Sequence, residues 1–369
     1  MNFPGCDRLS PPQRSHLFHA TDFISGYSAS DSITIPVLKK SVCYIVCGVM
    51  IREPNSENSK SDFPEFEVLM VQESRKDSYG KWYLPAGRLE LGESIVDGLK
   101  REVLEESGLQ CEPISLSCVE SLQGNWFRFS FLVQPTGGSL KTLSESDAES
   151  LQAQWFPVET LKNRGSDFKL RCSDCLYLVE RAVQQYSHFK PTNPRHPAYS
   201  PILIQPIPFQ HLIIQFLIVD KAMQRFLVIS SQREGVASTT SHNDSEPLSD
   251  SCQISLPAVR YSPGDIGIRK ILRNFSSEKI QLGQPHGVAR LQASPESTVH
   301  GLCLTLYFEL DSESNGILTQ SPGDDGQGDA YLHWRPLSPY QQISINQLNE
   351  FSVPFLCEGY STAQSSGSK

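Results

Sequence analysis

The hydrophobic residues of this chain fall mostly into short runs or alternate with polar residues, which is the pattern of β-strands in a buried sheet. Val, Ile, Phe and Tyr dominate these runs, and polar stretches separate them. In the first half of the chain the pattern predicts strands at residues 41–51, 66–74, 114–121, 126–135 and 153–161. In the second half it predicts strands at residues 211–220 and 226–231.

Helical spacing appears between these strands. Within residues 172–186, Leu176, Val179 and Val183 recur on one stripe of a helix. A second segment with helical spacing begins at Ile95, directly after a loop. Because helices are interspersed among strands, the chain is predicted to belong to the α/β class.

The helix predicted from Ile95 carries a crowded acidic face. Its apolar stripe consists of Ile95, Val96, Leu99 and Val103. Ser94 is suited to cap its N-terminus, and Gly108 to end it. Glu102, Glu105 and Glu106 form an adjacent stripe about a quarter-turn away, where like charges repel one another. The sequence therefore predicts that something positive lies between them.

Three carboxylates spaced in this way suit a hard divalent cation. Mg²⁺ and Mn²⁺ prefer oxygen ligands and leave coordination sites for water and for substrate phosphates. The simpler alternative is a solvated acidic helix surface, which is the better interpretation of an arbitrary E-x-x-E-E sequence. The choice between them depends on how specific the surrounding spacing is.

Composition and charge restrict the function further. The chain has 369 residues, enough for two domains, and 41 acidic against 32 basic residues give a net charge of −9. Such an acidic chain is a poor candidate for binding a nucleic acid polymer. The N-terminus lacks the apolar core of a signal peptide, and no apolar run is long enough to span a bilayer. Of the ten cysteines only Cys172 and Cys175 are close together, and we expect two reduced thiols there in a cytoplasmic protein.

The acidic helix lies within a longer pattern, G-x5-E-x7-R-E-U-x-E-E-x-G-U, where U is aliphatic. Every fixed place of the pattern is filled, by Gly87, Glu93, Arg101, Glu102, Val103, Glu105, Glu106, Gly108 and Leu109. A chance match to so many fixed letters is well below about one in a million per position. The segment resembles the Nudix box, and the chain is identified as a member of the Nudix hydrolase family.

The resemblance implies an α/β/α sandwich around a mixed sheet and hydrolysis of nucleoside diphosphates linked to another group. It implies that Mg²⁺, or alternatively Mn²⁺, is held by Glu102, Glu105, Glu106 and the backbone carbonyl of Ala86. Glu105 or Glu106 would be the catalytic base, and the sequence does not separate the two. Gly87, Glu93, Arg101 and Gly108 would have structural roles within the box.

Between about Lys39 and Pro157 the chain is most similar to the vertebrate-type Nudix enzymes that remove phosphate from 8-oxo-dGDP and 8-oxo-GDP. Such an enzyme prevents oxidised guanine from re-entering nucleotide pools and thereby prevents DNA damage. Alternatives are another Nudix substrate, such as ADP-ribose or a dinucleoside polyphosphate, or a nucleotide-binding protein without turnover. A purine base needs flat apolar surface and a few polar partners. The candidates for these contacts are Leu69, Phe127 or Phe129, Asp147 and Glu149.

The second half of the chain repeats the first in a reduced form. The segment beginning Leu-Pro-Ala at Leu256 aligns without gaps with the one beginning at Leu84, 172 positions earlier (256 − 84). Asn274 and Ser277 stand at the positions of Glu102 and Glu105, and only Glu278 keeps its carboxylate. We therefore predict a tandem duplication whose second copy has lost its metal site. This copy would replace the partner subunit of a dimer in a monomeric chain, or would cover the first domain's pocket.

The chain divides accordingly into five predicted parts. We expect a disordered N-terminal segment at 1–38, a catalytic Nudix domain at 39–188 and a Pro-rich linker at 189–203. A degenerate Nudix-like domain at 204–358 and a disordered tail at 359–369 complete the division. A polar segment near 233–251 is expected to be a loop of unassigned role.

Overall fold

We describe a computed structural model of the chain. It describes residues 42–54, 66–90, 93–122, 125–163, 168–189, 202–206, 212–230, 254–261, 282, 284–293, 301–310, 331–339, 342, 345–346 and 352–357. The predicted N-terminal segment, the C-terminal tail and the loop near 233–251 lie outside the described residues. So do most of the predicted linker and residues Asn274, Ser277 and Glu278.

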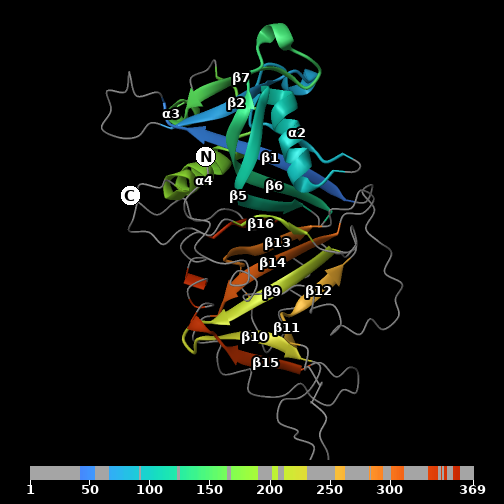
Figure 1. The fold of residues 1–369 in the computed structure, drawn as a ribbon, viewed down its shortest axis with the longest axis vertical. Helices are drawn as coiled ribbons and strands as arrows, with labels where there is room; N and C mark the ends of the chain where they lie inside the picture. The colour runs from blue at the N-terminus through green and yellow to red at the C-terminus, as the bar shows by residue number, and fades with distance from the viewer. Residues whose placement is uncertain are drawn as a thin grey trace, which may run out of the picture.

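The first half of the chain forms a mixed sheet (Figure 1). Its strands are β1 (Cys43–Arg52), β2 (Glu67–Glu73), β3 (Trp82–Tyr83), β4 (Ala86–Arg88), β5 (Leu109–Leu122), β6 (Trp126–Gly138) and β7 (Ser150–Pro157). The central strand β1 is parallel to β6 and antiparallel to β2 and β4. β7 pairs with β2, and β5 pairs with β6. The predicted α/β class, with its mixed sheet, is therefore present in this half.

Helices cover both faces of this sheet. On one face lies α2 (Ile95–Ser107), whose Leu99 and Val103 share a buried cluster with inward-facing residues of β1 and β6. On the other face lies α4 (Asp174–Phe189), whose Leu178 and Val179 belong to a separate buried cluster. The short helix α3 (Val158–Lys162) packs near α4. Two apolar cores, one on each side, therefore fix the position of α2 relative to the strand ends.

The ends of α2 follow from local sequence. The Ser94 hydroxyl accepts the backbone N–H of Asp97 at 3.1 Å and so caps the N-terminus. Gly108 adopts a left-handed conformation with φ of 78° and donates its N–H to the Leu104 carbonyl at 2.8 Å. A Cβ at this position would lie 2.2 Å from the Ser139 carbonyl oxygen. The predicted helix and both of its ends are confirmed.

Two predicted elements differ most from the structure. The strand predicted at 153–161 ends at Pro157, and Val158–Lys162 is instead the helix α3. Pro157 lacks the N–H that would continue a ladder, and Val158 and Leu161 lie three residues apart, on the buried side of a helix. The second difference is that β5 is longer than predicted. It begins at Leu109, where pairing with β6 accommodates polar residues and Pro113 through several bulges.

The second half of the chain forms another mixed sheet. Its strands are β8 (Gln205–Pro206), β9 (Leu212–Asp220), β10 (Arg225–Ser230), β11 (Ile254–Ser255), β12 (Ala258–Tyr261), β13 (Gly287–Ala293), β14 (Leu302–Glu309) and β15 (Tyr331–Pro336). β9 is parallel to β14 and antiparallel to β10 and β12, as β1 is to β6, β2 and β4. β13 pairs with β14, and β15 with β10, as β5 does with β6 and β7 with β2. The pairings of the two sheets therefore correspond strand by strand.

The last described strand returns to the first sheet. β16 (Phe355–Cys357) runs parallel to β5 and covers its edge, although the sequence division assigned it to the second domain. The Val119 N–H donates to the Pro354 carbonyl at 3.0 Å, and the Val288 N–H of β13 donates to the Val353 carbonyl at 2.7 Å. The segment 352–357 thus contacts both sheets, at the end of the first sheet opposite to β2 and β7 (Figure 1).

Candidate active site

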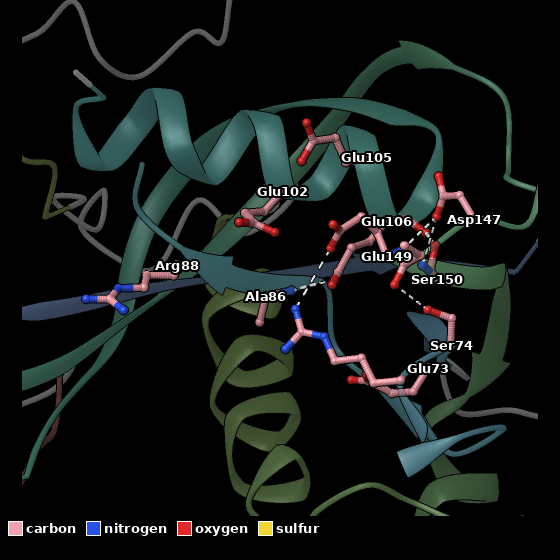
Figure 2. Close-up of polar contacts among 12 residues, drawn as sticks. Glu73, Ser74, Ala86, Arg88, Glu102, Glu105, Glu106, Asp147, Glu149 and Ser150 are labelled. Carbon is pink, nitrogen blue, oxygen red and sulfur yellow. Dashed lines mark hydrogen bonds and ion pairs between the residues drawn. The ribbon is translucent and has the colours of Figure 1, made fainter. Parts of the chain in front are cut away.

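Glu102 lies on α2 directly above β4 (Figure 2). Its side chain is buried, with only 7% of the residue exposed. A Cβ added to Gly87 on β4 would lie 2.0 Å from the Glu102 carboxylate, so only a glycine leaves room for that carboxylate. The spacing of Gly87 and Glu102 in the sequence is therefore explained by a direct contact between strand and helix.

Glu106, one turn further along α2, is also buried and points toward the same strand (Figure 2). Its carboxylate accepts the backbone N–H of Ala86 at 2.9 Å. This bond places the Ala86 backbone beside the carboxylates, which is where the predicted carbonyl ligand would have to be. Glu105 is the exposed member of the three, with 45% of its side chain accessible.

Arg101 supplies a positive charge to this acidic face. Its Nη1 lies 2.9 Å from Glu102 Oε1 and 2.9 Å from Glu105 Oε2. The same guanidinium pairs with Glu93 at 2.5 Å and donates to the Arg88 carbonyl at 3.1 Å. Arg101 thus ties the loop before α2 to the helix, and it offsets part of the repulsion between the carboxylates.

Burial acts most strongly on the two inner carboxylates. The pKa of Glu102 is raised by burial, against the opposing effect of Arg101. The pKa of Glu106 is raised well above its usual value by burial, and the nearby charges of Glu102 and Glu73 add to this effect. The site therefore holds negative charge that the described protein groups compensate only in part.

The donor set fits a hard divalent cation. Glu102, Glu105 and Glu106 offer only carboxylate oxygens, and Gly87 keeps open the space beside Glu102. Within the described residues, no three acidic, His or Cys side chains already converge on one point, and Glu105 contacts Arg101 instead. A cation binding here would add the charge compensation that buried carboxylates lack.

The predicted loop acids lie beside this cluster. Asp147 accepts the backbone N–H groups of Glu149 and Ser150, at 2.9 Å and 3.1 Å, and so shapes the end of the loop before β7. Glu149 lies 3.9 Å from Arg75, and its charge contributes to raising the pKa of Glu102. Figure 2 shows Glu149 pointing toward Glu106.

Leu69 and Phe127, the predicted apolar contacts for the base, lie elsewhere. Both are 0% exposed and belong to the core between the sheet and α2, as does the alternative Phe129. Their side chains offer no accessible surface to a nucleotide in this structure. Both side chains point to the face of the sheet that α2 covers. The alternation of residues along a strand does not by itself distinguish a core position from the wall of a pocket.

Sequence reasoning missed several charged residues around the cluster. Arg75 follows β2 and faces Glu149, and Lys141 bonds the end of α2. Glu73 is buried and pairs with Arg171 at 2.7 Å. The charge of Glu73 contributes to raising the pKa of Glu106, and the charge of Glu106 contributes to raising the pKa of Arg171. Arg75 and Glu149 meet because β2 pairs with β7, and Glu73 meets Arg171 because Arg171 bonds to Trp82 of β3, so no local pattern indicates these contacts.

Replacing Gly87 with Ala is expected to lower activity about tenfold or more, because the new methyl group displaces the Glu102 carboxylate. The rate of the nucleotide hydrolysis that the Nudix-box pattern predicts, measured in saturating Mg²⁺, would test this. Gly137→Ala is the matched control, since its Cβ would meet only the movable end of Gln110. Full activity in Gly87→Ala would mean that the position of Glu102 is unimportant.

Two other predictions bear on the class of protein. The described cysteines, including Cys172 and Cys175, are free thiols. Among the described helices, none combines the length and apolar character needed to cross a bilayer.

Comparison with known proteins agrees with this site. A family model for the NUDIX domain matches residues 49–172. The human protein named 8-oxo-dGDP phosphatase NUDT18 is 34% identical over 310 residues, which cover 84% of this chain and 85% of that protein. The mouse protein of the same name is 32% identical over 324 residues, covering 86% of this chain and 87% of that protein.

Among solved structures, a NUDIX hydrolase from Nitrosomonas europaea is 24% identical and covers 39% of this chain and 90% of its own, with a TM-score of 0.31. The match to the NUDIX domain model includes the acidic helix, and the similarity to the mouse and human proteins extends over most of both chains. The chain therefore belongs to the Nudix hydrolase family and is a Nudix hydrolase.

Proposed function

We propose that this enzyme hydrolyses oxidised purine nucleoside diphosphates, such as 8-oxo-dGDP and 8-oxo-GDP, to the monophosphate and orthophosphate in the presence of Mg²⁺. The observation that carries the proposal is similarity over most of the chain to proteins named 8-oxo-dGDP phosphatase, combined with a complete set of acidic residues on α2. This reaction would keep oxidised guanine out of nucleotide pools, in the cytoplasm.

The proposed roles follow the geometry of α2. Glu102, Glu105, Glu106 and the carbonyl of Ala86 would hold the cation, with Mn²⁺ as a possible substitute. When bound, the cation neutralises the diphosphate and makes water easier to deprotonate. Glu105 or Glu106 would take the proton from the water that attacks phosphorus, and cleavage of the P–O–P bond would give the monophosphate and orthophosphate. Gly87 and Arg101 would keep Glu102 in place.

The substrate would lie between α2 and two loops, the one that follows β2 and the one that precedes β7. Asp147 and Glu149 lie on one of these loops and are proposed to contact the nucleotide. Carboxylates accept hydrogen bonds from N–H groups, and oxidation of guanine at C8 adds an N–H to the base. A Leu69 or Phe127 contact with the base would require the core under α2 to open.

A nucleotide panel tests the proposal. Chromatography would measure the loss of substrate and the products formed in Mg²⁺ with 8-oxo-dGDP, dGDP, 8-oxo-dGTP, ADP-ribose and a dinucleoside polyphosphate. The highest kcat/KM is expected with 8-oxo-dGDP. A preference for ADP-ribose or for the triphosphate would contradict the proposed substrate but not the family. The absence of turnover with any nucleotide would favour a nucleotide-binding protein.

We further propose that the second half is a degenerate Nudix-like domain that serves as an internal partner for the first. The one-to-one pairing of the two sheets supports a duplication, and β12 lies 172 positions after β4 at Ala258 and Ala86. The contact through β5, β13 and segment 352–357 joins corresponding strands, as a twofold dimer does. Light scattering should give the mass of one chain, 41.2 kDa, and a stable dimer would contradict the proposal.

A further inference from the structure

The C-terminal turn of α2 is held by a single segment, Lys141–Ser150. A helix leaves its last four carbonyl groups without helical partners. The Leu104 carbonyl accepts the N–H of Gly108. The other three carbonyls, of Glu105, Glu106 and Ser107, are bonded by two residues of this segment.

Lys141 supplies two of these bonds and Ser150 the third. Lys141 Nζ donates to the Glu105 carbonyl at 2.9 Å, and the Lys141 backbone N–H donates to the Ser107 carbonyl at 2.9 Å. Ser150 Oγ donates to the Glu106 carbonyl at 2.7 Å (Figure 2). Two of the three residues held in this way carry the proposed metal-binding carboxylates.

The Lys141 side chain is buried, with 7% exposed, which is uncommon for lysine. Its ammonium pairs with Asp147 Oδ2 at 2.7 Å. The other oxygen of Asp147 accepts the N–H groups of Glu149 and Ser150. Lys141 therefore connects the end of α2 to the turn that presents Glu149. A positive charge at a helix C-terminus is also favourable for the helix dipole.

We propose that Lys141 is a positioning residue for the metal site: it fixes the last turn of α2, and with it Glu105 and Glu106, relative to β4 and to Glu149. The inference rests on the proposed function of these carboxylates. A buried lysine that only filled space would be replaceable by Met, which has a similar length and no charge. A lysine that fixes the ligands would not be.

Lys141→Met tests this directly. The free, full-length protein would be titrated with Mn²⁺ by calorimetry, and the variant is expected to bind about tenfold or more weakly, as for other residues that orient metal ligands. In Mg²⁺ titrations of activity, the half-saturating Mg²⁺ concentration should rise by a similar factor. Lys162→Met is the matched control, because Lys162 lies exposed on α3 and pairs, among the described residues, with nearby Glu159.

If Lys141→Met fails to fold, Ser150→Ala tests whether segment Lys141–Ser150 positions the proposed metal ligands. It removes the bond to the Glu106 carbonyl and leaves the ion pair between Lys141 and Asp147 intact. Weakened Mn²⁺ binding in this variant, with an unchanged circular dichroism spectrum, would support the positioning role. Wild-type Mn²⁺ affinity in the folded variants would overturn it. Because calorimetry does not depend on the nucleotide, a wrong substrate assignment would leave this result interpretable.

Discussion

Replacing Glu106 with Gln is expected to lower kcat at least about a hundredfold, as the loss of a catalytic base or of a metal ligand does. Glu106 is buried, lies beside Glu102 and accepts the Ala86 N–H. The amide oxygen of Gln can still accept that N–H, so the fold should be preserved. What the variant loses is the negative charge and the ability to take a proton.

Turnover of the preferred nucleotide in Mg²⁺ measures this effect. Glu105→Gln should show a loss of the same order, and a much larger loss in one of the two would identify the base. Glu159→Gln is the matched control, since Glu159 is exposed on α3 and pairs with Lys162 of the same helix. Undiminished rates in both Glu105→Gln and Glu106→Gln would refute the roles assigned to these residues.

The acidic helix could be predicted because its determinants are local. Ser94, Gly108 and the apolar stripe of α2 lie within one short stretch of sequence, and the structure places them as expected. Arg101 shows the limit of that reasoning. The pattern required a positive charge between the carboxylates and suggested a cation, whereas in the structure a guanidinium within the same helix already contacts Glu102 and Glu105.

Contacts between distant segments could not be predicted in the same way. Lys141 and Ser150 lie in a polar stretch predicted to be a loop, and their bonds to the end of α2 appear only in the folded structure. The pairing of β16 with β5 could not be predicted either, because the sequence of a three-residue strand does not indicate which strand it pairs with. The burial of Leu69 and Phe127 shows the same limit, since the face of a strand that a helix covers depends on the whole sheet.

The same limit applies to a buried charge network on the α4 face of the first sheet, which no sequence pattern indicated. Arg128 on β6 is 8% exposed. Its guanidinium donates to Asp174 at 2.6 Å and to Glu120 at 2.7 Å, and also to the Tyr83 hydroxyl at 2.5 Å. Asp174 is the first residue of α4, so the network joins this helix to β3, β5 and β6.

Arg128→Met is expected to lower the free energy of unfolding by about 3 kcal/mol, because it leaves the partly buried carboxylates of Glu120 and Asp174 without their cation. Arg128 holds the pKa of Asp174 below its usual value, against the effect of burial, which agrees with a stabilising pair. Urea denaturation followed by circular dichroism would measure the loss as a lower midpoint at unchanged slope.

Arg52→Met is the control on the same sheet. Arg52 is about half exposed, pairs with Glu67 and lies over the Trp155 ring, so its loss should cost only about 1 kcal/mol. Both arginines pair with a carboxylate on a neighbouring strand, but only Arg128 is buried. The difference between the two losses of stability therefore measures the effect of burial on such a pair. If both variants unfolded at the same urea concentration, the buried network would contribute no more to stability than an exposed ion pair.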